Sequence, residues 1–376
     1  MKSIIRAQDA TTSYFAFWFK SLILSAQTSL KEKHRLLATL LTVPTVAFFS
    51  ATAMAAIYAN QTELEAAISA VAVMGGGTVD IEDSNIVLTS TLEIPAGVTL
   101  TSSTNNGILE AASPPPPPSY ASITPTTPLA MGRTYNPMIH VTGDGVTISN
   151  ITIIGGPGTF PGSFNVDGIY AEGDVIIDSV TIQDIVDVKG TGTAIAIIDP
   201  ANATITNCSI TNITKNSIDF LSDGVLIATN NTITGPGADP TVAQNGIQVR
   251  GGTATLTDNT ISHIADTNIY GSACVAAIGG TVTVNGGSLT GCDYGVLSDG
   301  SFSALMGGTA SPAVTILSNT TISGNNIQNI NQTNGGTITM RAVSTSVPTT
   351  SGGILAVIGL LLAGLATVTL RRRRIS

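Results

Sequence analysis

A unit of alternating apolar and polar positions recurs seven times along this chain. Each unit is anchored on an aliphatic residue that follows Thr or Ser, and the positions five and seven residues earlier are also apolar, with Thr315 as the exception. The anchors are 23 to 33 residues apart: Ile153, Ile182, Ile210, Ile233, Ile261, Leu289 and Ile322. Alternating apolar positions are typical of strands that bury one face. The pattern therefore predicts a repetitive β structure.

Each unit also contains a predicted bend and a third strand. Three positions before the anchor the residue is Asn in four units: Asn150, Asn207, Asn230 and Asn319. Asn is the non-glycine residue that best tolerates a left-handed backbone, so we expect a sharp turn there and a ladder of Asn side chains along the stack. A third short strand is expected about fourteen residues before an anchor, as at residues 167–170, 245–249 and 273–275.

Strands this short cannot pair within one unit, because the chain bends between them. They can pair with the equivalent strands of the next unit at about 4.8 Å, so that equivalent aliphatic residues form columns. The predicted fold class is all-β, a single parallel β-helix over residues 56–340, in which each buried Ile or Leu contributes roughly 1.5–3 kcal/mol. A β-sandwich, with turn signals roughly every 8–12 residues, is the competing architecture.

The start of this region fits a solenoid with a covered end. Residues 60–68 predict a short capping helix with a Thr62–Glu65 capping box. Residues 75–79 (Gly-Gly-Gly-Thr-Val) and 94–100 (Ile-Pro-Ala-Gly-Val-Thr-Leu) follow. This order resembles the N-terminal part of the pectin-lyase-like right-handed β-helix superfamily, over about residues 57–340. The resemblance implies a right-handed coil, which the spacing alone does not establish.

The repeat is interrupted at residues 111–137. Five consecutive prolines, residues 114–118, lie within a stretch rich in Ser, Thr, Pro and Ala. This composition predicts an extended loop inserted into the coil. The loop is either functionally neutral or forms a lip over a lateral groove.

The N-terminal 55 residues predict an extended signal peptide region. A short basic segment precedes an apolar stretch from Leu36 to Phe49, and Ala53 and Ala55 occupy the −3 and −1 positions of a cleavage site. An N-terminal membrane anchor is the alternative interpretation. In either case the body of the protein is expected to be exported.

The C-terminal segment is organised in three parts. Residues 341–352 form a stalk and polar motif, residues 353–370 are uncharged and long enough to span a bilayer, and residues 371–376 form a basic tail expected to stay cytoplasmic. The motif comprises Val347, Pro348, Thr349 and Ser351, and the topology anchor comprises Arg371, Arg372, Arg373 and Arg374.

This arrangement resembles the PEP-CTERM sorting signals of Gram-negative bacteria, closest to the IPTL-CTERM variant. The chain departs from the pattern at Thr350 and at Gly352-Gly353. The resemblance implies recognition by an exosortase-like membrane protease. The protein would then be anchored in the membrane by its C-terminal helix, held at the cell surface or released.

The amino-acid composition and net charge limit the classes of molecule that the protein is expected to bind. Charged residues make up only 10% of the chain and aromatic residues 5%. The body carries 22 acidic and five basic side chains, hence a net charge of about −17. A nucleic-acid partner is therefore not expected, because it requires a basic footprint. An acidic rod would also repel polyanions unless Ca²⁺ bridged them.

The three cysteines, Cys208, Cys274 and Cys292, are too few for a disulfide framework. An odd number in an exported protein permits at most one pair and a free thiol. Small buried core residues are the favoured interpretation of all three.

Carboxylate chemistry has one candidate segment. Residues 165–169 (Asn-Val-Asp-Gly-Ile) resemble the Asn-Thr-Asp-Gly motif of polygalacturonase-like hydrolases, which also use a pair of aspartates one turn later. Here the comparable segment, residues 185–189, contains only Asp187, and the family's Gly-His-Gly and Arg-x-Lys elements are missing. We therefore expect Asp167 to form a turn, and His140 and His263 to be isolated.

A Ca²⁺-dependent lyase would need clustered aspartates and a basic side chain beside the sugar. Arg250 is the best single candidate, and Asp219, Asp223 and Lys215, about one turn upstream, could share its face. An exposed charge at a strand end is the alternative interpretation of Arg250. No Cys/His metal spacing or phosphate-binding loop is present in the sequence, so no cofactor is expected apart from Ca²⁺ in a lyase.

Two functional hypotheses follow from the sequence. The first is a non-catalytic, surface-sorted β-helix for adhesion or for contact with extracellular matrix or glycan. The second is a polysaccharide lyase or glycoside hydrolase acting on an extracellular glycan. Its groove residues would be Asp187, Lys189, Asp219 and Arg250.

Overall fold

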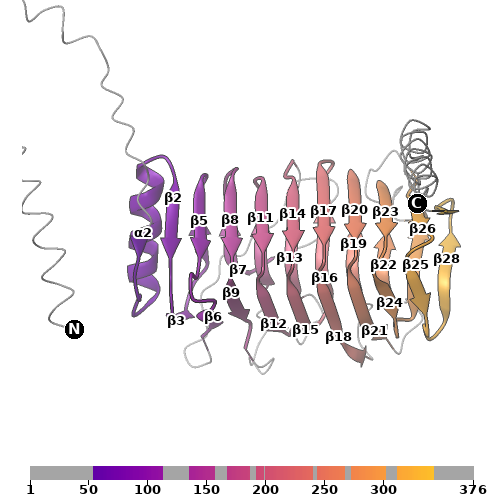
Figure 1. The fold of residues 1–376 in the computed structure, drawn as a ribbon, viewed down its shortest axis with the longest axis horizontal. Coiled ribbons are helices and arrows are strands. Elements are labelled where there is room, and N and C mark those ends of the chain that lie inside the picture. Colours follow the sequence, from indigo (N-terminus) through magenta and orange to yellow (C-terminus); the bar gives the residue numbers. More distant parts are fainter. Residues whose placement is uncertain are drawn as a thin grey trace, which may run out of the picture. The chain divides into compact units, whose positions relative to one another are not determined.

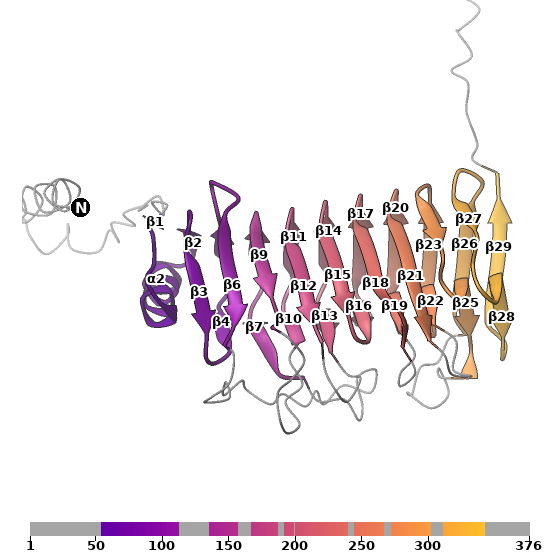
Figure 2. The same ribbon diagram turned by 90° about the horizontal axis from the view of Figure 1, so that it is seen from below.

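The computed structural model describes residues 54–112, 135–156, 167–186, 192–198, 200–239, 244–266, 272–301 and 311–342. These residues form one helix, α2 (Gln61–Val73), and 29 short strands. Every strand pair is parallel, and the strands form three sheets that run along one axis (Figures 1 and 2). We call them sheets A, B and C.

Each coil contributes one strand to each sheet in the order A, B, C. Sheet A contains β1 (Met54–Ala55), β2 (Gly77–Asp80), β5 (Val98–Thr101), β8 (Val146–Ser149), β11 (Val175–Asp178), β14 (Ala203–Thr206), β17 (Val225–Thr229), β20 (Thr253–Thr257), β23 (Thr281–Asn285), β26 (Ala313–Leu317) and β29 (Thr337–Arg341). Sheet B contains β3 (Asn85–Leu88), β6 (Gly107–Ala111), β9 (Ile151–Ile154), β12 (Thr181–Ile185), β15 (Ser209–Ile213), β18 (Thr232–Asp239), β21 (Thr260–Asp266), β24 (Ser288–Thr290) and β27 (Thr321–Ser323). Sheet C contains β4 (Leu92–Ile94), β7 (Pro137–Val141), β10 (Asp167–Ala171), β13 (Thr193–Ile198), β16 (Asn216–Leu221), β19 (Asn245–Val249), β22 (Ala273–Ala277), β25 (Tyr294–Asp299) and β28 (Gln328–Thr333).

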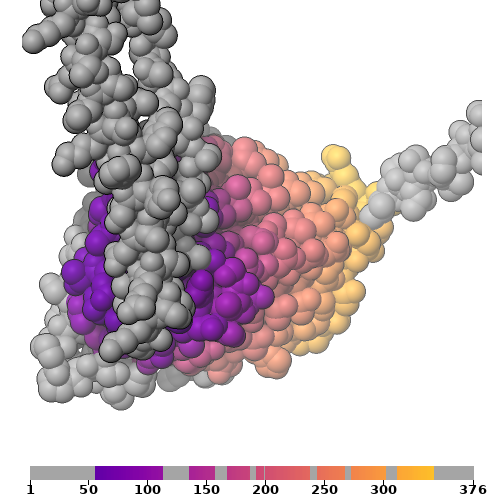
Figure 3. Space-filling model, turned by 60° about the vertical axis from the view of Figure 1, so that its left-hand side comes forward, coloured from indigo at the N-terminus to yellow at the C-terminus, as the bar shows by residue number. Residues whose placement is uncertain are grey.

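The predicted parallel β-helix is confirmed by the register of the anchors. In sheet B, Ile182 pairs with Ile153 on one side and Ile210 on the other. The same column continues through Ile233, Ile261, Leu289 and Ile322. The anchors before Ile322 are buried, and the coils follow one another as bands of colour in Figure 3. Stacked aliphatic columns therefore form the core.

The last coil departs from the predicted register by one residue. Val282 pairs with Val314, and Val284 pairs with Ile316, so Thr315 faces outward. The corner that follows has one more residue than the corresponding corner of the preceding coil. This insertion explains why Thr315 broke the apolar pattern in the sequence.

The predicted bend lies where sheet A passes into sheet B. The residue three positions before the anchor has a positive φ, between 51° and 72°, in six units: Asn150, Ser179, Asn207, Asn230, Asp258 and Gly286. Asn319, in the shifted coil, is not among the positive-φ residues.

The predicted Asn ladder was placed one residue too early. Asn207 and Asn230 are exposed, because the left-handed turn directs them to solvent, whereas the next residues, Asn231 and Asn259, are buried. Asn231 Nδ2 donates to Asn259 Oδ1 at 2.9 Å and to the Ile205 carbonyl at 2.9 Å. The ladder therefore lies inside the corner, where it satisfies buried backbone groups.

Helix α2 lies at the N-terminal end of the coils (Figure 1). Asn60 caps it by accepting a hydrogen bond from the Glu63 backbone N–H at 3.1 Å, and the Glu63 carboxylate accepts from the Ala59 N–H at 2.9 Å. The predicted Thr62–Glu65 box is therefore wrong by two residues, since Asn60 precedes the first helical residue. Leu64 and Ile68 are buried in the main core.

Two cysteines are paired, in contrast to the favoured expectation. Cys274 of β22 and Cys292, which precedes β25, form a disulfide, whereas Cys208 is a buried free thiol. The pairing joins two neighbouring coils.

Both terminal predictions concern residues outside the described part. The signal region ends at the first described residues, and the sorting motif, apolar segment and arginine tail follow the last one. In the part that the structure describes, no helix is both long and apolar enough to cross a membrane.

Candidate functional site on sheet C

Sheet C differs from sheet A because both faces of several of its central strands are buried. Every residue of β10, β13, β16 and β22 is buried, whereas β8 and β11 of sheet A alternate between buried and more exposed positions. In β16, for example, Ile218 and Phe220 belong to the main core. Asp219 lies between them on the outer face of the sheet and is nevertheless fully buried. A polar side chain in such a position needs a partner.

One outward position per coil forms a straight row, which we call the sheet C row. Register pairs join its members from coil to coil: Glu93, His140, Tyr170, Ala196, Asp219, Gln248 and Ala276. Neighbouring members are about 4.8 Å apart, the spacing of hydrogen-bonded strands. Polar and titratable groups far apart in the sequence are thus aligned along the axis.

A histidine cluster occupies the N-terminal end of the row. His140 Nδ1 lies 2.8 Å from Glu93 Oε2, and its Nε2 lies 3.2 Å from Glu172 Oε2. Tyr170 donates a hydrogen bond to the other oxygen of Glu172 at 3.2 Å. The His140 side chain is 12% exposed, whereas Glu93 and Glu172 are 51% and 43% exposed. The two carboxylates are therefore accessible to solvent, whereas the imidazole between them is largely buried.

Two aromatic contacts hold this cluster in place. The Tyr170 ring lies 5.1 Å from the Tyr135 ring and packs edge-on against His140 at 5.4 Å. Burial, reinforced by the negative charge of Glu172, raises the pKa of Tyr170 well above its usual value. Tyr170 therefore stays a neutral hydrogen-bond donor. Each nitrogen of His140 faces a carboxylate, and only the doubly protonated ring can donate to both at once.

A second network lies three coils further along the same row. Asp219 accepts hydrogen bonds from Asn216 Nδ2 and Gln248 Nε2, both at 3.0 Å. Arg250 Nε lies 3.6 Å from the same carboxylate, and both side chains are buried. Arg250 is therefore not an exposed strand-end charge. Instead it neutralises an aspartate that would be costly to bury alone.

The other sequence candidates are dispersed. Asp223 is exposed at the corner between sheets C and A, and Lys215 lies at the opposite corner, half-buried. Asp187 and Lys189 lie outside the described residues. Asp167 was expected to form a turn, but it is the first residue of β10. Its buried carboxylate accepts the backbone N–H groups of Asn136 and Thr193, both at 2.8 Å, and so joins the two neighbouring coils.

His263 is set apart from the sheet C row. It is exposed in sheet B and has a φ of +59°. In the described residues, no group of three or more His, Cys, Asp or Glu side chains is arranged to hold a metal ion.

The histidine cluster is not apparent from the sequence, because Glu93, His140 and Glu172 are far apart along the chain. A signal was present in the third strand of each unit, in which one residue stands between two apolar ones. The triplets are Leu92-Glu93-Ile94, Ile139-His140-Val141, Ile169-Tyr170-Ala171, Ile218-Asp219-Phe220 and Ile247-Gln248-Val249. Aligning these triplets would have brought the row together.

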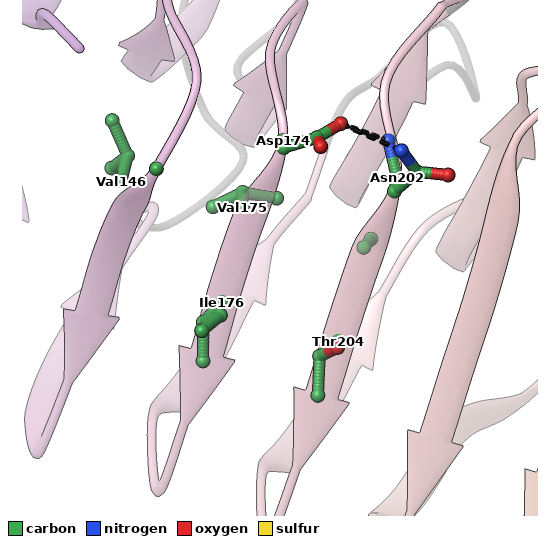
Figure 4. Close-up of a pocket in the computed structure, with 8 residues that line it drawn as sticks. Val146, Asp174, Val175, Ile176, Asn202 and Thr204 are labelled. Carbon is green, nitrogen blue, oxygen red and sulfur yellow. Dashed lines mark hydrogen bonds between the residues drawn. The ribbon is translucent and has the colours of Figure 1, made fainter. Parts of the chain in front are cut away.

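A surface depression on sheet A has fewer titratable side chains than the sheet C row. It crosses β8, β11 and β14 and is lined by Val146, Val175 and Ile176 among others (Figure 4). Asp174 is its titratable lining residue, and the carboxylate accepts the backbone N–H and the side-chain amide of Asn202 at 2.7 and 2.9 Å. Its polar groups are thus engaged in joining two coils.

Comparison with known proteins supports the architecture. The model of a family described as a right handed beta helix region matches residues 137–310. This region is a right-handed β-helix. The spacing of the repeats did not establish whether the coil is left- or right-handed. The resemblance of the N-terminal segments implied a right-handed coil.

Several solved structures are similar to the structure of this chain. The A-module of Azotobacter vinelandii mannuronan C-5 epimerase AlgE4 is 13% identical, covers 78% of this chain and 96% of its own, and has a TM-score of 0.36. The corresponding AlgE6 module is 12% identical with coverages of 78% and 97% and a TM-score of 0.37. The Dettilon tailspike protein (gp208) is 13% identical, with coverages of 76% and 67% and a TM-score of 0.29. No curated protein matches the sequence.

Proposed function

We propose that this protein is an exported, non-catalytic right-handed β-helix that contacts an extracellular glycan through the outer face of sheet C. The observation that carries the proposal is the sheet C row, which aligns polar groups with the long axis of the coils. At the N-terminal end of the row the carboxylates of Glu93 and Glu172 reach solvent, so a linear polymer that lies along the axis can meet polar groups of successive coils there. The members from Ala196 to Ala276 are buried and would not be in contact with it. The half-exposed carboxylates of Glu93 and Glu172 would accept hydrogen bonds from sugar hydroxyls.

The charge of the body favours a neutral glycan. It carries 22 acidic and five basic side chains, and a strongly acidic surface repels a polyanion. Arg250 does not reverse this preference, because it is buried against Asp219. A neutral or amino-substituted polysaccharide is therefore the proposed partner.

The geometry favours binding over cleavage. Glycoside hydrolysis uses two carboxyl groups that flank the scissile bond. Here His140 lies between Glu93 and Glu172 and contacts both, so the imidazole occupies the position that a glycosidic bond would need. The Tyr170 hydroxyl donates to Glu172, and its side chain is fully buried.

Export is part of the same proposal. The N-terminal signal region, the sorting motif at residues 347–351 and the arginine tail support delivery across the inner membrane and processing by an exosortase-like protease. The Cys274–Cys292 disulfide is consistent with this route, because disulfides persist mainly in oxidising compartments. Helix α2 would cover the first coil, and the C-terminal segment would anchor the rod in the membrane or release it at the surface.

Glycan binding by matched histidine variants tests the proposal. We expect the purified protein to bind a neutral polysaccharide in calorimetry, and His140→Asn to weaken binding about tenfold, equivalent to about 1.4 kcal/mol. His263→Asn is the control, since Asn tolerates the left-handed backbone at that exposed position of β21. A panel of neutral and acidic glycans that shows no binding would contradict the proposal.

The same panel distinguishes the alternative of a lyase or hydrolase. Release of reducing ends or unsaturated products, measured with Ca²⁺ and with chelator, should not occur. Cleavage that is lost in His140→Asn but retained in His263→Asn would replace the binding proposal with catalysis at the sheet C row.

A further inference from the structure

The outer face of sheet B carries a regular array of hydroxyl groups. Five consecutive strands, β15, β18, β21, β24 and β27, each present Ser or Thr on both sides of the inward anchor. Their register pairs place the hydroxyl residues in two straight columns: Ser209, Thr232, Thr260, Ser288 and Thr321 in one, and Thr211, Thr234, Ser262, Thr290 and Ser323 in the other. We call these ten residues the hydroxyl array.

The array is a two-dimensional lattice. Neighbouring residues within a column are about 4.8 Å apart, and the two columns are separated by about 6.6 Å, twice the rise of a parallel strand residue. The pairing register of these strands shifts only between Thr234 and Gly237, which lies beyond the two columns. The lattice therefore continues without a break over five coils.

The array is uncharged and faces solvent. All ten side chains are half-buried or exposed, and none of their hydroxyls hydrogen-bonds another group within the described part of the chain. Sheet A differs in its pattern, because its outward columns are interrupted by apolar residues such as Val225 and Ile227, and because Thr206 donates to Asp178. The array is thus a neutral surface on a strongly acidic body, and it offers no attraction to an ionic partner.

We propose that the hydroxyl array binds the surface of ice. The oxygen atoms on the prism faces of hexagonal ice repeat at intervals close to both spacings of the array. Each Thr or Ser hydroxyl can take part in the hydrogen-bonded lattice, and the Thr methyl groups fill the space between lattice positions. One such hydrogen bond contributes little, but many in register must break together, so attachment becomes persistent.

A crystalline polysaccharide is the competing occupant, and the composition of the face disfavours it. Flat sugar rings commonly stack on aromatic side chains. The five strands contain no Phe, Tyr or Trp. The hydroxyl array is also on a different sheet from the sheet C row, so its function is independent of the glycan-binding proposal.

Two lysine variants of the same coil test the proposal. Thr260 of β21 belongs to the array, whereas Thr253 of β20 lies on sheet A, and both are exposed. We expect the purified full-length protein to inhibit ice recrystallisation. Thr260→Lys should raise the concentration required by about tenfold or more, because a charged chain projecting from the centre prevents close contact. Thr253→Lys should leave the activity unchanged.

A third variant separates the hydroxyl effect from misfolding. Thr260→Val keeps the β-branched shape and removes one hydroxyl, and circular dichroism of all variants checks the fold. We expect it to retain the fold and to lose part of the activity. Absence of ice activity in the natural protein, or equal loss in Thr253→Lys and Thr260→Lys, would overturn the proposal. Pull-down by crystalline cellulose or chitin that Thr260→Lys abolishes, with ice activity unaffected, would assign the array to a polysaccharide instead.

Discussion

His140 Nδ1 lies 2.8 Å from Glu93 Oε2, although the two residues belong to coils separated by the insertion that contains five prolines. The contact exists because β4 and β7 pair in parallel with Glu93 opposite His140. Glu172, from the next coil, contacts the other nitrogen of the same ring. Stacking of successive coils thus builds a site from single residues, each of which is unremarkable in its own segment.

Removal of the Asp219 carboxylate should destabilise the protein severely. Asp219→Ala leaves Arg250 buried without its anionic partner, and breaking a buried pair in this way typically costs about 3–5 kcal/mol. Urea unfolding followed by circular dichroism measures the loss. Glu110→Ala, at a half-buried outward position of β6, should change the free energy of unfolding by no more than about 0.5 kcal/mol. Equal effects of the two substitutions would contradict the buried-pair interpretation.

The Cys274–Cys292 disulfide should stabilise the C-terminal coils. It closes a loop with a sequence separation of 18, for which chain-entropy arguments give about 3 kcal/mol. The double variant Cys274→Ala/Cys292→Ala should therefore unfold at a lower denaturant concentration than the natural protein. Dithiothreitol should lower the midpoint of the natural protein and leave that of the double variant unchanged. A midpoint of the natural protein that dithiothreitol leaves unchanged would argue against the pairing.

The free thiol of Cys208 should be unreactive in the folded protein. Burial raises its pKa to about 11, and the thiolate is the form that reacts with disulfide reagents. Ellman's reagent at pH 8 should therefore detect one thiol per chain only after denaturant is added. Cys208→Ala should show none in either state. Rapid labelling of the natural protein under native conditions would contradict the burial of this residue.

The hydrogen bonds of Asp178 at the sheet A corner should make the stability of the protein depend on pH in the acidic range. A hydrogen bond from Thr206, helped by Asn207 and Ser179, lowers the pKa of Asp178 and outweighs partial burial. A carboxyl group with a lowered folded-state pKa stabilises the protein above its unfolded pKa of about 3.9 and loses this contribution as the pH falls through the lower folded-state value. The Asp178 carboxylate is half-buried and partly screened by solvent, so its contribution should not exceed about 1 kcal/mol.

Comparison with Asp178→Asn isolates this contribution. The natural protein should be the more stable of the two at pH 7, and the difference in unfolding free energy should shrink as the pH is lowered below about 4. Urea unfolding at a series of pH values measures it. A difference that stays constant down to pH 2 would show that the carboxylate charge is not involved.

The candidate site was only partly accessible from the sequence. Asp219 and Arg250 were expected to share a face because one unit separates them. In the structure, Arg250 Nε lies 3.6 Å from Asp219 Oδ1. Arg250 was also considered as a surface charge, since the repeat does not reveal that both faces of the central strands of sheet C are buried. His140 was treated as isolated, because the insertion before β7 hides the register that pairs it with Glu93.

The sequence by itself determined the repeat, the inward columns and the left-handed corners, because these follow from short-range periodicity and from the conformational preferences of single residues. Only the tertiary structure decided which outward residues meet, which strands are buried on both faces, and which cysteines pair. Those outcomes depend on the register between coils, and insertions of different length shift that register. Thr315 illustrates this limit, since the sequence showed only that it broke the apolar pattern, whereas the pairing of Val284 with Ile316 revealed the shift of one residue that turns Thr315 outward.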